Sequence, residues 1–184
     1  MKLLDKMKRV IVYPDEFFQE EASPTRGDES GTRTAFLYYF LISIASLGIS
    51  WLLFSTGITP GSFFGMGNIF FKGNFSEIIV PIIFMILGLV SLGILSIVTG
   101  MIAKKPTSNV LKAGAYGLTP AVLLSWLPVL NLLAGLWGWI LFVKGGSILN
   151  KMGWKSFLYS SIPGMILILG LNMLTNYFVM QAFA

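Results

Sequence analysis

Histidine and cysteine are both absent from this sequence of 184 residues. Without cysteine the chain has no disulfide, no thiolate metal site and no cysteine nucleophile. Without histidine it also lacks the commonest general base and the commonest metal ligand. No HExxH, GxSxG, Walker A or paired-carboxylate pattern is present either. The sequence therefore predicts a protein that is not an enzyme, with no catalytic residues, no metal site and no cofactor.

Charge is also scarce, because only 11% of the residues are charged and 55% are hydrophobic, whereas about a quarter of a typical soluble domain is charged. Seven of the eight acidic residues lie in the first 29 positions. The sequence after Arg33 is apolar and is interrupted by a few lysines, as expected of a chain in lipid. We expect a tail and linker over residues 1–33 and a membrane domain over residues 34–184. The net charge of +5 indicates loops at an anionic leaflet and no binding of nucleic acid.

The apolar sequence divides into five segments, and the division depends on how the third and fourth are separated. Pro128 is sixteen residues after Lys112 and sixteen before Lys144. One helix between the two lysines would be about 46 Å long, which exceeds a hydrocarbon core of about 30 Å. We therefore expect a turn near Pro128. The five expected spans are Ala35 to Thr56, Ile78 to Ala103, Ser108 to Leu127, Leu130 to Leu149, and about Lys155 to Met180.

The distribution of basic residues supports five spans and gives an orientation. With five spans, twelve of the thirteen basic residues lie on the side of the N-terminus, against nine with four spans. Basic residues favour the cytoplasmic side of a membrane. The predicted fold class is an all-α polytopic bundle of five transmembrane helices, with a cytoplasmic N-terminus and the C-terminus outside or in a lumen.

The tail has the pattern of two short amphipathic helices. In the first, the apolar residues fall at the spacing of one helical face: Leu3, Leu4, Met7, Val10 and Ile11. Pro14 interrupts this pattern and begins a second short helix, on which Phe17 and Phe18 share one side. The sequence leaves the location of the tail helices open. They lie either on the membrane surface or against the protein's own loops.

Small and polar residues recur within the spans at the spacing of helix contacts. Helices in lipid associate through small residues that allow a close approach of their backbones. We expect these residues to pack helices within the chain or to form a seam between copies: Gly93, Ser96, Gly100, Ala113, Ala121, Ala134, Gly138, Ser160 and Gly164. Asn172 and Asn176 are one turn apart, and we expect them to form hydrogen bonds between helices.

The stretches "AYGLTPAVLLSWLP" and "LWGWILFVKGGSILNKMGWKSFLYSSIP" resemble the Yip1 domain family, and Tyr116, Gly117 and Pro120 carry the first part of the resemblance. The resemblance implies an integral membrane protein with five helices and a cytosolic N-terminus. For eukaryotic relatives it further implies a scaffold that binds Rab-type GTPases in vesicle traffic. The short tail, which has no "DLxGP"-type stretch, makes this chain more similar to prokaryotic members.

Two functions remain open on the sequence. The first is a non-enzymatic adaptor or scaffold of Yip1 type, which recruits partners at the cytoplasmic face and has the bilayer, itself or related membrane proteins as partners. The alternative is a small transporter or channel subunit that acts as a homo-oligomer, with prolines and asparagines along a polar path. The expected location is the plasma membrane for a prokaryotic source and the early secretory pathway for a eukaryotic one.

Overall fold

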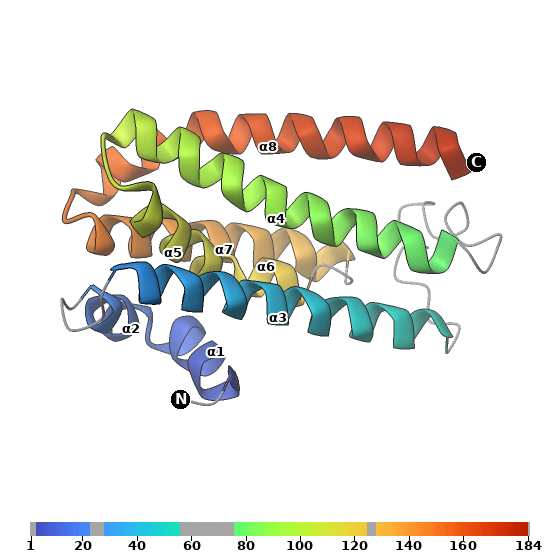
Figure 1. Ribbon diagram of the computed structural model, residues 1–184, viewed down its shortest axis with the longest axis horizontal. Coiled ribbons are helices and arrows are strands. Elements are labelled where there is room, and N and C mark those ends of the chain that lie inside the picture. Colours follow the sequence, from blue (N-terminus) through green and yellow to red (C-terminus); the bar gives the residue numbers. More distant parts are fainter. Residues whose placement is uncertain (1–2, 23–27, 56–75, 125–127, 184) are drawn as a thin grey trace.

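The protein is all-α in the part of the chain that the computed structural model describes, which is residues 3–22, 28–55, 76–124 and 128–183. These residues form eight helices and no strand (Figure 1). The helices are α1 (Leu3–Val12), α2 (Pro14–Glu21), α3 (Asp28–Ser55), α4 (Ser76–Ala103), α5 (Thr107–Gly117), α6 (Thr119–Leu123), α7 (Pro128–Leu149) and α8 (Trp154–Phe183). The predicted all-α class is confirmed.

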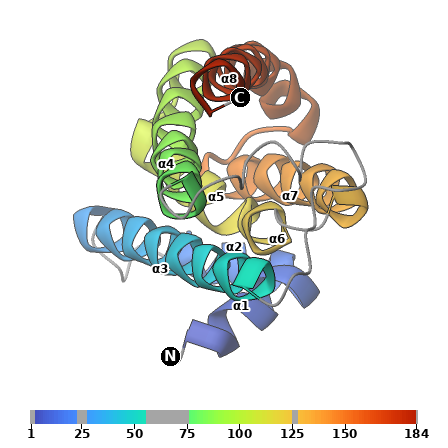
Figure 2. The same cartoon turned by 90° about the vertical axis from the view of Figure 1, so that its right-hand side faces the viewer.

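Three of these helices contain a stretch that is long and apolar enough to cross a membrane. The stretches are Gly31–Ile49 in α3, Met85–Ala103 in α4 and Trp154–Thr175 in α8. A shorter apolar stretch, Leu133–Leu149, lies in α7. Seen from one end of the bundle, α4 and α8 lie on one side and α1 and α2 on the opposite side (Figure 2). Five crossings and the orientation of the chain stay predictions.

The third expected span is not one continuous helix, because it breaks at Leu118 between α5 and α6. Pro120 explains the break, since proline has no N–H to donate to the carbonyl group four residues earlier. That carbonyl belongs to Tyr116, and the hydroxyl group of Thr119 donates to it instead at 2.6 Å. The prediction of one continuous helix from Ser108 to Leu127 is therefore wrong.

Two boundaries also differ from expectation. Helix α3 begins at Asp28, so the last part of the expected linker over residues 1–33 is helical. Helix α7 begins at Pro128, two residues before the expected start at Leu130. Proline is favoured in the first turn of a helix, where its missing N–H costs nothing. The turn was expected near Pro128, which the structure instead places at the start of α7, and residues 125–127 before it lie outside the described part of the chain.

Two lysines in left-handed backbone conformation end α4 and α7. Lys104 has a φ of 52° and Lys151 a φ of 49°. After each, a backbone N–H bonds back to the helix, from Lys105 to Gly100 at 3.0 Å and from Met152 to Ser147 at 3.0 Å. These bonds satisfy carbonyl groups at the helix ends. Both turns lie at the end of the bundle where α2 lies, so lysines gather there (Figure 1).

The core contains large aromatic side chains, whereas the outer faces of the long helices remain apolar. The largest fully buried side chains are Tyr116, Phe17, Phe18, Phe142 and Phe157. Met101 on α4 and Met173 on α8 are 73% and 74% exposed, and many leucines and isoleucines of α3, α7 and α8 are also exposed. An apolar surface of this extent indicates a membrane environment.

Candidate functional site

The N-terminal tail is docked into the bundle through α2. Phe17 and Phe18 are fully buried in the core, and α2 packs on α7. The ring of Phe18 lies against Gly145 so closely that a methyl group at position 145 would overlap it. For Phe17 and Phe18 the membrane interface was one of the two locations that the sequence left open. Burial of both rings inside the protein excludes that location for them and favours the other, packing on the protein.

The apolar face of α1 is partly buried against the protein and partly exposed. Val10 is fully buried, and Met7 packs against the core. Leu3 and Leu4 remain exposed, Leu4 to 73%. The part of α1 that adjoins α2 is therefore packed on the protein, and only the first turn presents leucines outward.

Lys6 is the charged centre of the docked tail. Its side chain is buried, and its ammonium group donates to the hydroxyl group of Tyr116 at 2.6 Å and lies 3.3 Å from the carboxylate of Glu21. The same ammonium group lies 4.5 Å from the ring centroid of Tyr116, 5.8 Å from that of Phe17 and 5.9 Å from that of Tyr38. These three rings form an aromatic cage, in which cation–π attraction helps to replace the lost water. A buried charge requires such partners.

The aromatic cage joins the tail to the motif residue Tyr116. Its ring, fully buried on α5, meets Phe17 edge-on at 4.9 Å and Tyr38 at 5.0 Å between centroids. The hydroxyl groups of Tyr38 and Thr119 are 3.2 Å apart. Because Thr119 donates its hydrogen to the carbonyl group of Tyr116, Tyr38 is the donor to Thr119. The motif thus connects α1, α2, α3 and α5 at one point.

The other two motif residues shape the contact between α5, α6 and α7. A methyl group at Gly117 would lie 2.5 Å from the backbone nitrogen of Phe142 and 2.7 Å from its Cα atom. At Gly138, it would lie 3.3 Å from the carbonyl oxygen of Gly117 and 3.4 Å from Ala121. Pro120 is buried beside this contact. The two backbones approach closely here because both glycines lack a side chain.

The remaining small residues do not all lie at helix contacts. Gly164 of α8 faces Leu95 and Thr99 of α4, at 3.0 and 3.3 Å from where its methyl group would be. Gly93 has no atom within 4 Å of that position and makes no such contact, contrary to expectation. Gly100 faces the turn that leads into α5, near Lys105 and Thr107. Four others are buried inside the bundle: Ser96, Ala113, Ala134 and Ser160.

The predicted interhelical asparagines are not placed as expected where the structure describes them. The side-chain amide of Asn172 donates to the carbonyl group of Ile168, four residues earlier in α8, at 2.9 Å. Both residues belong to α8, so this hydrogen bond lies within one helix and does not join two helices. The side chain of Asn176 lies outside the described residues.

One ion pair at the surface joins the tail to the bundle, and a second joins the two helices of the tail. Asp15 of α2 pairs with Lys144 of α7 at 2.7 Å, and both side chains are about half exposed. Arg9 of α1 pairs with Glu20 of α2 at 2.5 Å. The hydrogen bond to Glu20 raises the pKa of Arg9 above its ordinary value, so Arg9 stays charged. Exposed pairs contribute little to stability, so the buried aromatic cage holds the tail.

Sequence reasoning did not identify Lys6, Glu21 or Tyr38 as parts of this site. The signal for Lys6 was its position, three residues after Leu3 and four before Val10, which places it on the apolar face of α1. A lysine on the buried face of a helix requires a partner. The partner Tyr116 is 110 residues away, so the pattern of α1 could not name it.

Replacing Tyr116 with phenylalanine tests the hydrogen bond at the centre of the site. The variant keeps the aromatic ring and removes the acceptor for the buried ammonium group of Lys6. Hydrogen bonds to charged groups contribute about 1.5–3 kcal/mol, so we expect the tail to undock more readily by that amount. Hydrogen exchange of the α1 and α2 amides measures this change. Unchanged exchange would show that Lys6 does not depend on Tyr116.

Comparison with known proteins agrees with the motif. A family model described as Yip1 domain matches residues 8–174. No match was found among curated proteins or among solved structures. The match begins at residue 8, so it includes the end of α1 and all of the docked α2. With its long apolar helices the chain is a multi-pass membrane protein. The chain belongs to the Yip1 domain family.

Proposed function

We propose that this protein is a non-enzymatic membrane adaptor, which recruits partners at the cytoplasmic face through its docked tail. One observation supports the proposal: the tail is held against the bundle on its inner side, and its outer side exposes apolar side chains. The inner side of the tail is held by Phe17, Phe18 and Lys6. The tail surface, formed by Leu4, Val12 and Tyr13, is more than half exposed at each position.

A tail held in one position favours the binding of a partner. A flexible segment would lose conformational freedom on binding, whereas a docked one has already lost it. Apolar side chains surrounded by charged ones, such as Asp5, Lys8 and Glu16, are typical of interaction sites. Membership in a family associated with membrane traffic agrees with an adaptor. Binding of a Rab-type GTPase rests on the family analogy alone and forms no part of this proposal.

Photo-crosslinking in native membranes tests the adaptor function. A photoreactive residue is placed at Leu4 or at Val12, and as a matched control at Lys151, which is exposed in a turn at the same end of the bundle. We expect one protein product from both tail positions and none from position 151. With the photoreactive residue at position 12, Leu4→Glu should reduce this product about tenfold, and Val12→Glu should do the same with the photoreactive residue at position 4, as expected for apolar residues at the centre of an interface.

Deletion of the tail is not a suitable variant, because it would remove Phe17 and Phe18 from the core. The two glutamate substitutions change exposed positions only. Crosslinks to lipid alone would contradict the adaptor function. Crosslinks only to a second copy would contradict it as well and would favour the homo-oligomeric transporter, which a solute flux assay in proteoliposomes then tests.

A further inference from the structure

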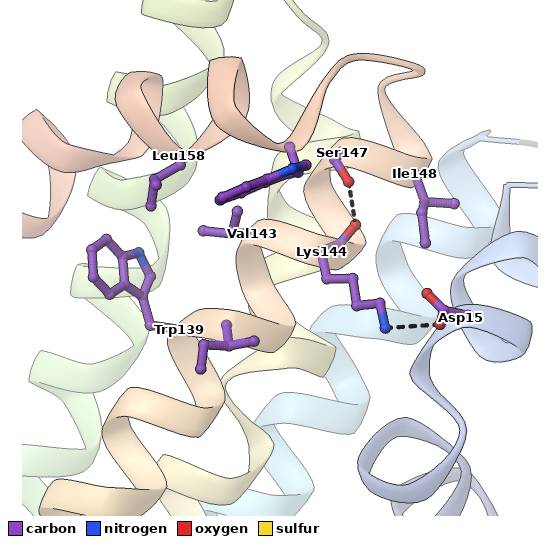
Figure 3. Close-up of a pocket in the computed structure, with 9 residues that line it drawn as sticks. Asp15, Trp139, Val143, Lys144, Ser147, Ile148 and Leu158 are labelled. Atoms are coloured by element: carbon purple, nitrogen blue, oxygen red, sulfur yellow. Dashed lines mark hydrogen bonds and ion pairs between the residues drawn. The ribbon is translucent and has the colours of Figure 1, made fainter.

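A groove between α7 and α8 lies beside the docked tail and is separate from the aromatic cage. It has a volume of about 510 Å³, within the range of roughly 300–1,000 Å³ that is usual for ligand sites. Figure 3 shows Asp15 of α2 at one end of the groove, where its carboxylate meets Lys144. The lining residues are Asp15, Trp139, Ile140, Val143, Lys144, Ser147, Ile148, Trp154 and Leu158.

The walls of the groove are apolar, and its polar groups gather at one end. The indole of Trp139 extends from α7 towards Leu158 of α8, with Val143 between the helices (Figure 3). Helix α8 contains an apolar stretch long enough to cross a membrane, and α7 contains a shorter apolar stretch. Ile140 and Trp154 line the groove and are 53% and 58% exposed, so the groove opens sideways on the face of α7 and α8 that lipid would cover. A molecule with a hydrocarbon chain fits these walls.

One lysine lies at the polar end of the groove, and two more follow it in the sequence. Lys144 lines the groove, and Lys151 and Lys155 follow in the turn and in the first residues of α8. The ammonium group of Lys155 lies 5.9 Å from the ring centroid of Trp154, which lines the groove. The lining itself contains one basic residue, Lys144, and one acidic residue, Asp15. Basic residues next to a membrane attract anionic headgroups, and tryptophan favours the headgroup level.

We propose that this groove binds one anionic phospholipid. The acyl chain lies along Trp139, Val143 and Leu158, and the phosphate group binds the ammonium group of Lys144. That ammonium group has three N–H donors, and it is half exposed while it pairs with Asp15. Ser147 does not donate to the phosphate, because its hydroxyl group donates to the carbonyl group of Lys144 at 2.8 Å.

Asp15 and the phosphate compete for Lys144, and this competition gives the proposal a distinctive test. Removing the charge of Lys144 should weaken lipid binding, whereas removing the charge of Asp15 should strengthen it. The tail stays docked in both cases, because Phe17 and Phe18 are held in the core and not by this surface pair. The proposal does not depend on the adaptor function.

The experiment compares the full chain in detergent with phosphatidylglycerol and with phosphatidylcholine, each carrying the same brominated acyl chains. Native mass spectrometry counts the retained lipid, and bromine quenching of tryptophan fluorescence reports contact with the groove. We expect roughly fivefold more phosphatidylglycerol than phosphatidylcholine to be retained, as one basic residue at an anionic headgroup provides. Lys144→Gln should remove this preference, and Asp15→Asn should increase it.

Lys151→Gln is the matched control, because it removes the same charge from an exposed position that does not line the groove. Glycerol phosphate, which has the headgroup without a chain, should not displace the lipid. The proposal is overturned by equal retention of both lipids, by an equal loss in Lys144→Gln and Lys151→Gln, or by displacement with glycerol phosphate. It is also overturned if a second copy of the chain excludes lipid from the groove.

Discussion

Replacing Gly117 with alanine should destabilise the protein strongly. The added methyl group would lie 2.5 Å from the backbone nitrogen of Phe142 and 2.7 Å from its Cα atom. These are backbone atoms of α7, which cannot rotate away as a side chain would. Overpacking of a core usually costs about 1–3 kcal/mol, and we expect the upper part of that range. Thermal unfolding of the purified protein in detergent, followed by tryptophan fluorescence, measures the loss.

Gly135→Ala is the matched control, because Gly135 lies in α7 and has no atom within 4 Å of the added methyl group. Alanine is favoured over glycine in a helix by roughly 0.5–1 kcal/mol, so this variant should be unchanged or slightly more stable. Equal stability of the Gly117→Ala and Gly135→Ala variants would contradict the close approach of α5 and α7.

Replacing Lys6 with methionine should release the tail from the bundle. The substitution keeps the length of the side chain but leaves the carboxylate of Glu21 without the charge that lies 3.3 Å from it in a buried position. Breaking a buried ion pair by removing one partner costs about 3–5 kcal/mol. We therefore expect the amide groups of α1 and α2 to exchange much faster, while those of α4 and α8 change little.

Two further variants separate this effect from a general loss of charge. The double variant Lys6→Met/Glu21→Gln should recover part of the docking, because it removes the buried carboxylate together with the ammonium group that lies beside it. Arg9→Gln, which breaks the exposed pair with Glu20, should have little effect. If Lys6→Met and Arg9→Gln gave the same change in exchange, Lys6 would not be buried in the aromatic cage.

The long helices could be predicted from the sequence, but the break between α5 and α6 was missed. Apolar segments of sufficient length indicate α3, α4 and α8 directly, because a bilayer requires about 20 such residues. Pro120 was visible in the third segment, yet prolines occur within transmembrane helices when other groups satisfy the freed carbonyl. Here the hydroxyl group of Thr119 satisfies that carbonyl group beside a break at Leu118, and spacing alone does not reveal whether a proline breaks the helix.

The sequence predicted where the helices lie along the chain better than it predicted which face of each helix contacts the protein. Lipid and the inside of a bundle are both apolar, so the sequence does not distinguish them by hydrophobicity. Small-residue spacing therefore selected Gly138 and Gly164, which lie at close contacts, together with Gly93, which does not. The docking of α2 also escaped prediction, because two adjacent phenylalanines suit a lipid surface as well as a protein core.

Zero-length crosslinking can test whether α1 and α2 are packed on the membrane domain. A carbodiimide joins a carboxylate to an amine only when the two touch, and Asp15 and Lys144 are 2.7 Å apart and accessible. The protein is placed in nanodiscs of phosphatidylcholine, which offers neither an amine nor a competing anionic headgroup, and Asp15→Asn is the control. We expect an amide bond between Asp15 and Lys144 within one chain. Crosslinks of the tail carboxylates to lysines of the tail alone would contradict it.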